Sequence, residues 1–210
     1  DIIDKDIFFS YTTNKDQCRW EHTSLEELPI LLQAGRVIGI VQGNSEHGPR
    51  ALGNRSIICS PTQGMKDKLN IVKKREFFRP FAPIVRLEDV SKYFNWKGES
   101  RSMSYSCTVK NKYKLELYSV IHADRSSRVQ TITREQNRFL YDLLTEMDNQ
   151  EIVPVLINTS FNVQGKPILN SYKDAFHILQ ETDLDHVIII NEYTKKDGAL
   201  FTKRLRGIDF

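Results

Sequence analysis

One polar loop carries residue types that suit a phosphate group. Residues 43–55 combine three glycines, which allow a ligand to approach the backbone closely, with Arg50 and Arg55. The planar guanidinium group is a rigid fork of donors that matches phosphate oxygens. Taken alone, the loop is more simply interpreted as a surface segment with solvated arginines, so other segments must support the phosphate hypothesis.

A second cluster of cations lies beside a stiffened segment. It has four members within seven positions: Lys73, Lys74, Arg75 and Arg79. Pro80 and Pro83 restrict the backbone next to them and lower the entropy cost of holding a charge in place. For the two lysines a solvated helix end is the simpler interpretation. Arg79 stands among phenylalanines, where a partly buried guanidinium would need an anionic partner.

Amides and hydroxyls gather in a third stretch, Asn158-Thr159-Ser160-Phe161-Asn162, which follows an apolar run. These side chains can donate to a carbonyl or phosphoryl oxygen and accept from an amide nitrogen. A carbamoyl group presents both kinds of partner. A capping turn that closes a strand is the alternative interpretation. Lys166 follows and could supply another cation.

A fourth stretch, residues 122–131, places His122 and Asp124 two positions apart, on one face of an extended chain, with two arginines nearby. Such a pair is more often a structural hydrogen bond than an acid–base device, and no nucleophile is placed to need it. The three cysteines are widely spaced and form no Cys-x-x-Cys pair, and the five histidines never fall at ligand spacing. We therefore expect no metal site in this chain.

Composition places the chain among globular proteins. Its 210 residues are 40% hydrophobic and 27% charged, which is enough for one α/β domain with a real core. A formal charge of +3 is too small to predict a nucleic-acid partner. Because neither a membrane-spanning run nor a signal peptide is present, we expect a cytoplasmic protein without a membrane partner. The chain starts at Asp1 rather than Met, which is typical of a fragment.

Strand and helix patterns alternate along the chain and predict a single α/β domain. Buried strands are expected at 37–41, 56–59, 151–157 and 187–190, and helices at 23–35, 65–74, 87–94, 133–147 and 171–179. Residues 75–83 should be extended, because their prolines disfavour helix. Open α/β sheets place ligands at the carboxyl ends of strands, where residues 43–55 and 158–162 are expected.

The polar segments contain three motifs that are specific in combination. They are Gly43-x-x-Glu46-x-Gly48-Pro49-Arg50-Ala51-Leu52-Gly53-Asn54-Arg55-Ser56, then Met65-x-Asp67-x-x-Asn70-x-x-Lys73-x-Arg75-Glu76-x-x-Arg79-Pro80-Phe81-Ala82-Pro83, then Asn158-Thr159-Ser160-Phe161-Asn162 with Gly165-x-Pro167. Together they closely resemble the nodulation-protein and antibiotic O-carbamoyltransferase family, roughly over residues 30 to 195.

The resemblance implies a domain organisation and a fold. Residues 29–210 would form the C-terminal domain of a longer enzyme, and residues 1–28 a lead-in or linker from a missing N-terminal domain. The C-terminal domain is similar to YrdC proteins, which are α/β folds with a twisted mixed sheet and flanking helices around an open basic cavity.

The resemblance also implies the chemistry. The domain would bind carbamoyl phosphate and ATP, with Mg²⁺ on the departing pyrophosphate, and would form a carbamoyl-adenylate. The missing N-terminal domain, which carries its own metal, would be the partner that transfers the carbamoyl group to a hydroxyl acceptor.

Site residues are carried over by motif. The resemblance implies that Arg50 and Arg79 hold phosphate and carbamoyl oxygens and that Asn158 and Ser160 orient the carbamoyl group. Further substrate- and nucleotide-binding residues are expected to be Gly48, Arg55, Lys73, Arg75, Thr159, Asn162 and Lys166.

The sequence departs from the family pattern in three places. Many members carry Arg at the position of Asn44, most carry an aromatic residue at His47, and Asp-Gly-Thr is usual where Asp124-Arg125-Ser126 stands. These departures bear on substrate preference and rate. The alternative function is a YrdC-like module that binds RNA or a nucleotide without turnover.

Overall fold

The computed structural model describes residues 7–14, 17–46, 48, 50–190, 194–196 and 199–201. Its strands are β1 (Ile7–Asn14), β2 (Gln17–Thr23), β3 (Ile38–Gln42), β4 (Arg55–Cys59), β5 (Ala82–Arg86), β6 (Gln130–Ile132), β7 (Val155–Ser160), β8 (His186–Ile190), β9 (Thr194–Lys196) and β10 (Ala199–Phe201). Its helices are α1 (Leu28–Gln33), α2 (Met65–Val72), α3 (Val90–Tyr93), α4 (Arg138–Asn149) and α5 (Tyr172–Glu181).

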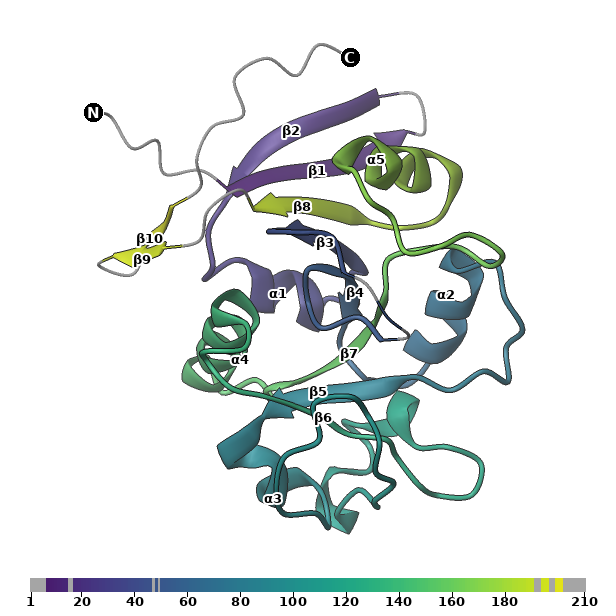
Figure 1. Cartoon of the computed structure of the whole chain (residues 1–210), viewed down its shortest axis with the longest axis vertical. Helices are drawn as coiled ribbons and strands as arrows, with labels where there is room; N and C mark the ends of the chain where they lie inside the picture. Colours follow the sequence, from purple (N-terminus) through teal and green to yellow (C-terminus); the bar gives the residue numbers. More distant parts are fainter. Residues whose placement is uncertain are drawn as a thin grey trace.

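Eight of the strands form one mixed sheet, in the order β2-β1-β8-β3-β4-β7-β5-β6, and β9 pairs with β10 in a separate hairpin (Figure 1). The β3–β8 and β5–β6 pairs are parallel, whereas β4 is antiparallel to both β3 and β7. The predicted α/β class, with a mixed sheet and flanking helices, is confirmed.

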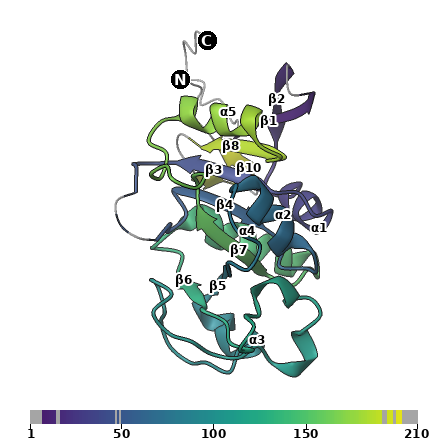
Figure 2. The ribbon, with the colours of Figure 1, turned by 90° about the vertical axis from the view of Figure 1, so that its right-hand side faces the viewer.

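Alternate residues of the central strands contribute to two separate hydrophobic cores. Ile57 packs in the core that contains the apolar residues of α2 and α5, and Ile58 packs in the core that contains those of α1 and α4. Figures 1 and 2 show the helices distributed around the sheet in this way. Strands β4 and β8 are buried along their whole length, as continuous apolar runs predict for strands covered on both faces.

Capping residues set the helix starts. Helix α4 begins at Arg138 rather than at Thr133, because Asn137 is extended and its side-chain oxygen accepts a hydrogen bond from the Leu140 amide at 3.0 Å. Helix α5 begins after Ser171, whose side chain forms a reciprocal capping box with Asp174, in agreement with the predicted start.

The prediction of an extended segment at residues 75–83 is wrong for its first half. The Arg79 amide donates to the Glu76 carbonyl at 3.1 Å, which closes a turn, and β5 begins only at Ala82. The buried Asn70 side chain holds this turn by donating to the carbonyls of Phe77 and Arg79, both at 3.2 Å. A tertiary contact therefore overrides the local preference of the prolines.

Most of the predicted lead-in segment, residues 1–28, is described by the structure. Strand β1 pairs with β8 and β2 pairs with β1, so both extend the edge of the same sheet. Whether this segment leads in from a preceding domain stays a prediction. Within the described ranges, no helix combines the length and the apolar character that crossing a bilayer requires.

Residues 87–129 form a lobe beyond the β5–β6 edge, at the bottom of Figure 1. The lobe has few regular elements, but Tyr93, Phe94 and Leu117 are fully or almost fully buried in it. The centres of the Tyr93 and Tyr113 rings lie 4.6 Å apart. The lobe is therefore packed well enough to hold side chains rigidly against the sheet.

The loop of residues 43–55 approaches the start of α4 so closely that a Cβ at residue 53 would displace the side-chain ends of Asn137 and Leu140. Gly53 has a φ of +108°, and an added Cβ would lie 2.4 Å from Asn137 Nδ2 and 2.5 Å from Leu140 Cδ1.

We predict that Gly53→Ala lowers the free energy of unfolding by about 1 to 3 kcal/mol more than Gly98→Ala does, through overpacking. Gly98 is the matched control, because its φ of +106° carries similar strain and nothing lies within 4 Å of the added Cβ. Urea denaturation measures both; equal losses would contradict the packing argument.

Candidate functional site

The motif segments that are far apart in sequence meet at one cavity of about 370 Å³. It lies between the end of β7, the turn before β5, the loop of residues 43–55 and the lobe. Its lining comprises Arg50, Ala51, Arg75, Phe78, Arg79, Pro80, Phe81, Ala82, Met103, His122, Arg128, Asn158, Thr159 and Ser160. Arg50, Arg79 and Ser160, which the resemblance assigns to one ligand, line this cavity together; their contacts with a ligand stay a prediction. We call this space the arginine cavity.

Four guanidinium groups border the arginine cavity, and none of its described lining residues is an Asp or Glu. Arg75 is the most constrained: its Nε donates to the Asn70 side-chain oxygen at 2.6 Å, and its guanidinium carbon lies 4.2 Å from the centre of the Phe81 ring. Burial, followed by repulsion from Arg79, lowers the pKa of Arg75 to about 10. Arg79 is half exposed, with Glu76 at 3.4 Å. Such a cavity favours an anionic ligand with several oxygens.

Asn158 lies at the floor of the arginine cavity and is 1% exposed. Its Nδ2 donates to the Ala51 carbonyl at 3.0 Å and to the Gln130 side-chain oxygen at 2.6 Å. These two acceptors fix the orientation of the amide and leave Oδ1 buried, with no hydrogen-bond partner among the described residues. An unpaired buried acceptor is costly, so this oxygen marks a place where a ligand N–H group would be stabilised.

Lys73 does not line the cavity, and the solvated helix end proposed for it is wrong. Its side chain is buried under the end of β7, where Nζ donates to the Ser160 carbonyl at 2.6 Å, and to the carbonyl and side-chain oxygens of Asn162 at 3.1 and 2.9 Å. Lys74, by contrast, is exposed as expected. Lys73 therefore supports Ser160, which lines the arginine cavity, and Asn162 beside it, and does not border the cavity itself.

Arg55 also has a supporting position. Its guanidinium is buried and donates to the backbone carbonyls of Gln42 at 2.6 Å, Asn54 at 3.0 Å and Asn170 at 3.2 Å. Glu46 completes the loop, because its carboxylate accepts from the amides of Leu52, Asn54 and Arg55 at 2.8 to 3.1 Å. These contacts hold the loop on which Arg50 is presented.

The remaining predicted residues divide between two spaces. Thr159 lines the arginine cavity, whereas Gly48 and Asn162 line a neighbouring chamber of about 580 Å³ that shares Ser160 with it. Lys166 is exposed and lines neither space. We call the neighbouring chamber of about 580 Å³ the amide chamber; its other lining residues are Ser45, Glu46, Pro167, Ile168, Leu169 and Asn170.

Sequence reasoning set aside the fourth stretch, yet the lobe brings His122 and Arg128 into the arginine cavity. The signal was present, since His, Asp and Arg stand close together there. His122 Nδ1 lies 3.3 Å from Ser126 Oγ, which in turn donates to Asp124 at 2.6 Å. Burial lowers the pKa of His122, which favours the neutral form of the imidazole. The lobe thus adds a fourth guanidinium and a neutral ring.

A family profile described as carbamoyltransferase C-terminus matches residues 30–196. The chain belongs to this family. It is 41% identical over 160 residues to nodulation protein NolO of Bradyrhizobium diazoefficiens and 36% identical over 184 residues to 3'-hydroxymethylcephem-O-carbamoyltransferase of Streptomyces clavuligerus.

The carbamoyltransferase domain covers only part of these relatives. The matches span 74% and 86% of this chain but 29% and 35% of the relatives. Among solved structures, HypF of T. kodakarensis has a TM-score of 0.58 at 15% identity over 95% of this chain and 26% of its own. HypF in its phosphate- and nucleotide-bound form has a TM-score of 0.57 at 17% identity, over 94% of this chain and 23% of its own. These two structures share the fold.

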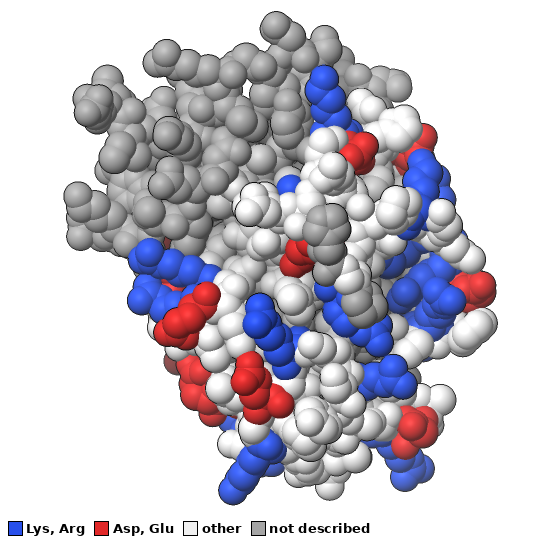
Figure 3. Space-filling view, in the orientation of Figure 1, with Lys and Arg blue, Asp and Glu red and all other residues white. Residues whose placement is uncertain are grey.

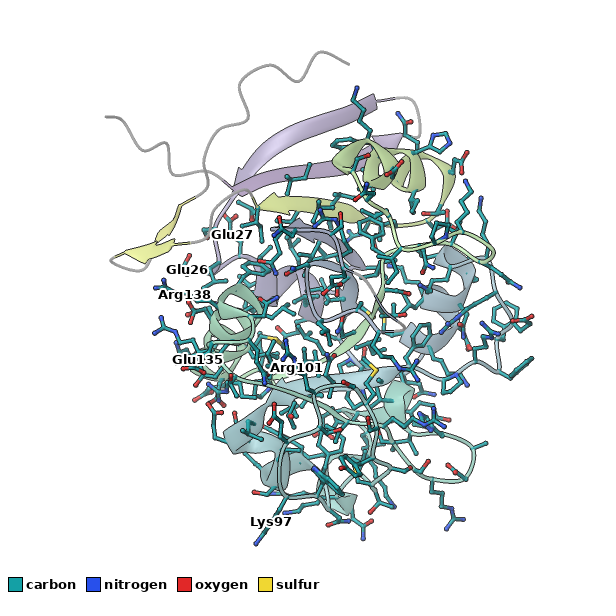
Figure 4. All side chains as sticks on the ribbon, viewed as in Figure 1. Glu26, Glu27, Lys97, Arg101, Glu135 and Arg138 are labelled. Atoms are coloured by element: carbon teal, nitrogen blue, oxygen red, sulfur yellow. The ribbon has the colours of Figure 1, made fainter. Side chains whose placement is uncertain are left out.

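Charge is unevenly distributed on the carbamoyltransferase domain. Figure 3 shows Lys and Arg side chains across the middle of one face, with Asp and Glu mostly toward its margins. The labelled acids Glu26, Glu27 and Glu135 lie on the α4 side of the molecule (Figure 4). The small formal charge therefore conceals a basic centre.

Lys73 gives the domain a defined pH dependence. Burial, and then repulsion from Arg75, lowers its pKa from 10.5 to about 7. Below about pH 7 the folded and unfolded states both carry the proton, and the folded state bears the full cost of burying the charge. Between the folded-state pKa of Lys73, about 7, and its ordinary pKa of 10.5, the unfolded state binds more protons than the folded state. We therefore predict that the free energy of unfolding rises with pH in this range, by at most about 1.4 kcal/mol per pH unit.

Urea denaturation from about pH 6 to about pH 10 measures this slope. Lys73→Met should lose it, whereas Lys74→Met, which changes an exposed neighbour, should keep it. If Lys73→Met does not fold, NMR titration of the Lys73 ammonium in the wild-type domain tests the same point. An ammonium that keeps its proton through pH 9 would contradict the prediction.

Proposed function

We propose that this domain binds carbamoyl phosphate and ATP and forms carbamoyl-adenylate, which the remainder of a longer O-carbamoyltransferase transfers to a hydroxyl group. The observation that carries the proposal is the arginine cavity, which is lined by four arginines and by Asn158, without a carboxylate among the described lining residues. The Asn158 Oδ1 atom is buried and has no hydrogen-bond partner among the described residues. Guanidinium groups match phosphate oxygens, and an amide oxygen matches a carbamoyl N–H.

The two kinds of group are separated in depth. Asn158 is almost fully buried on β7, whereas Arg50 and Arg79 stand at exposed positions around the opening. A molecule with a small amide end and a phosphate end would therefore enter with the amide first. Thr159 offers a hydroxyl group beside Asn158 for the carbamoyl oxygen. The Ser160 hydroxyl donates to Asn162 Oδ1 at 2.7 Å and would have to leave that bond to donate to a ligand. Carbamoyl phosphate has this polarity.

The reaction balances with one water molecule. Water cleaves carbamoyl phosphate to carbamate and inorganic phosphate; a carbamate oxygen then attacks the α-phosphorus of ATP, forming an O–P bond as the bond to pyrophosphate breaks. Positioned cations stabilise the charge that develops on both phosphoryl centres. Mg²⁺ would arrive on the phosphates of ATP, the usual mode for this ion. The residues of this chain would bind and orient the two substrates and neutralise the charge on their phosphoryl groups.

We assign transfer of the carbamoyl group to the part of the longer relatives that this chain does not cover. The chain spans about a third or less of the curated relatives described above. Their names connect them with nodulation and with carbamoylation of a hydroxymethylcephem. One of the two HypF structures is a phosphate- and nucleotide-bound form, which supports a nucleotide role for this fold. Carbamoyl phosphate, ATP and an N-terminal domain are therefore the proposed partners.

The activating role predicts a specific exchange reaction. Labelled pyrophosphate should enter ATP only when carbamoyl phosphate is present, and the isolated domain should transfer no carbamoyl group to an alcohol. Arg50→Ala should reduce exchange, because a guanidinium at the cavity is lost, whereas Arg101→Ala should not, because Arg101 is exposed outside the lining. Exchange that is indifferent to carbamoyl phosphate would exclude the activating role and favour a binding module without turnover.

Arg79 tests whether the guanidinium fork itself matters. An ammonium keeps the charge but cannot bind two phosphate oxygens side by side, so Arg79→Lys should weaken carbamoyl phosphate binding nearly as much as Arg79→Ala. Because the side chain is half exposed, we expect the lower end of the range for charge-assisted bonds, about 1.5 kcal/mol or tenfold in Kd. Calorimetric titration measures both variants. Wild-type affinity in Arg79→Lys would show that only the charge is used.

A further inference from the structure

One buried amide beside the arginine cavity, Gln130, has no role in the proposed function. Gln130 lies on β6 and is 2% exposed. Its Oε1 accepts a hydrogen bond from Asn158 Nδ2 at 2.6 Å, and its Nε2 donates to the Ala51 carbonyl at 3.4 Å. Asn158 and Ala51 line the cavity, whereas Gln130 does not. Gln130 therefore contacts two cavity residues from behind the lining.

The two amides meet across a strand that lies between them. Strand β5 separates β6 from β7, and its residue paired with Asn158 is Ala82, whose side chain is a single methyl group. Ile84, two positions further on the same face of β5, pairs with Gln130. Because Ala82 is small, the Gln130 side chain can extend past β5 to Asn158. The contact thus depends on the register of three strands.

The Ala51 carbonyl fixes the orientation of both amides. A carbonyl oxygen can only accept, and Asn158 Nδ2 lies 3.0 Å from it. Turning the Asn158 amide over would place its oxygen against the oxygens of Ala51 and Gln130, so its nitrogen faces both acceptors. Both protons of Nδ2 are then used. Asn158 Oδ1 is left buried, with no partner among the described residues.

An amide held in this way can distinguish two ligands that differ at one group. Carbamoyl phosphate carries an NH₂ group where acetyl phosphate carries a methyl group of similar size. Asn158 Oδ1 can accept from the NH₂ group, whereas the methyl group leaves this buried acceptor unpaired, which costs free energy. An amide that could turn over would discriminate less, because its own NH₂ group would face the ligand part of the time.

We propose that Gln130 is a positioning residue that makes this domain selective for carbamoyl phosphate over acetyl phosphate, by holding the Asn158 amide with its oxygen available to the ligand. This inference rests on the proposed function. Gln130 acts through Asn158 and does not touch the ligand. Its role therefore changes the ratio of two affinities, whereas a purely structural role would change both affinities together.

Calorimetric titration of the 210-residue domain with the two phosphates measures this ratio. The wild-type domain should prefer carbamoyl phosphate by about 5- to 100-fold, because the buried acceptor is paired in only one complex. Gln130→Met has a similar volume and removes the hydrogen bond to Asn158. It should reduce the preference by about 3- to 10-fold and leave the affinity for acetyl phosphate within about twofold. Gln130→Glu keeps an oxygen for Asn158, so it should keep the preference although its charge weakens the binding of both anions.

Thr131→Val is the matched control. Thr131 follows Gln130 on β6 and is 1% exposed, but its side chain is on the opposite face of the strand, where Oγ1 accepts from the Ser100 amide at 2.7 Å. This variant also loses a buried hydrogen bond and should keep the preference. If Gln130→Met does not fold, hydrogen exchange of the Asn158 side chain in the wild-type domain, followed by NMR, tests the same geometry: both Nδ2 protons should be protected.

The outcomes are distinct. Equal weakening of both ligands in Gln130→Met would show that Gln130 only supports the fold. Equal binding of the two phosphates by the wild-type domain would overturn the selectivity and leave the proposed function standing. Rapid exchange of either Asn158 Nδ2 proton would show that the amide is not held. Failure of the wild-type domain to bind carbamoyl phosphate at all would remove the proposed function, and this inference with it.

Discussion

Three of the cations at and around the candidate site are held by uncharged oxygens, and the geometry of the site depends on these contacts. Arg79 differs, because it pairs with Glu76 at 3.4 Å. Lys73 donates to carbonyl and amide oxygens of Ser160 and Asn162, and Arg55 donates to backbone carbonyls. Arg75 is held by the side-chain oxygen of Asn70. Because neutral acceptors satisfy the donors without cancelling the charge, the positive potential remains available to a ligand.

Elsewhere in the described part of the chain, several cations are paired with carboxylates. Asp185 accepts from Arg36 and Lys68, and Arg86 lies 2.5 Å from Asp89. No Asp or Glu is among the described lining residues of the arginine cavity, although Glu76, outside the lining, pairs with Arg79. Keeping like charges together and partly buried costs stability, which the lowered pKa values of Lys73 and Arg75 reflect. An anion in the cavity would relieve this repulsion, so ligand binding and folding are expected to reinforce each other.

The sequence predicted the parts of the fold that depend on local pattern. Apolar runs located β3, β4 and β8, and the Ser171 cap located α5, because burial on both faces and capping each leave a signature in consecutive residues. Local pattern could not show that Lys73 turns inward, since its partners Ser160 and Asn162 are distant in sequence. It could not decide the role of Arg128 either, because a loop-rich lobe brings that side chain to the cavity.

One buried hydrogen-bond network of amide groups joins the segments that line the arginine cavity. Asn158 on β7 donates both to the Ala51 carbonyl of the glycine-rich loop and to Gln130 on β6, and Gln130 itself points its amide nitrogen to the Ala51 carbonyl at 3.4 Å. Strand β7 carries Asn158, the loop that presents Arg50 carries Ala51, and strand β6, which follows Arg128, carries Gln130. The residue that we propose for recognition of the carbamoyl group therefore also fixes the distance between opposing arginines. Loss of the Asn158 amide would remove an acceptor from the ligand and, at the same time, release the guanidinium groups from their common geometry, so its effect on binding should exceed that of a single hydrogen bond.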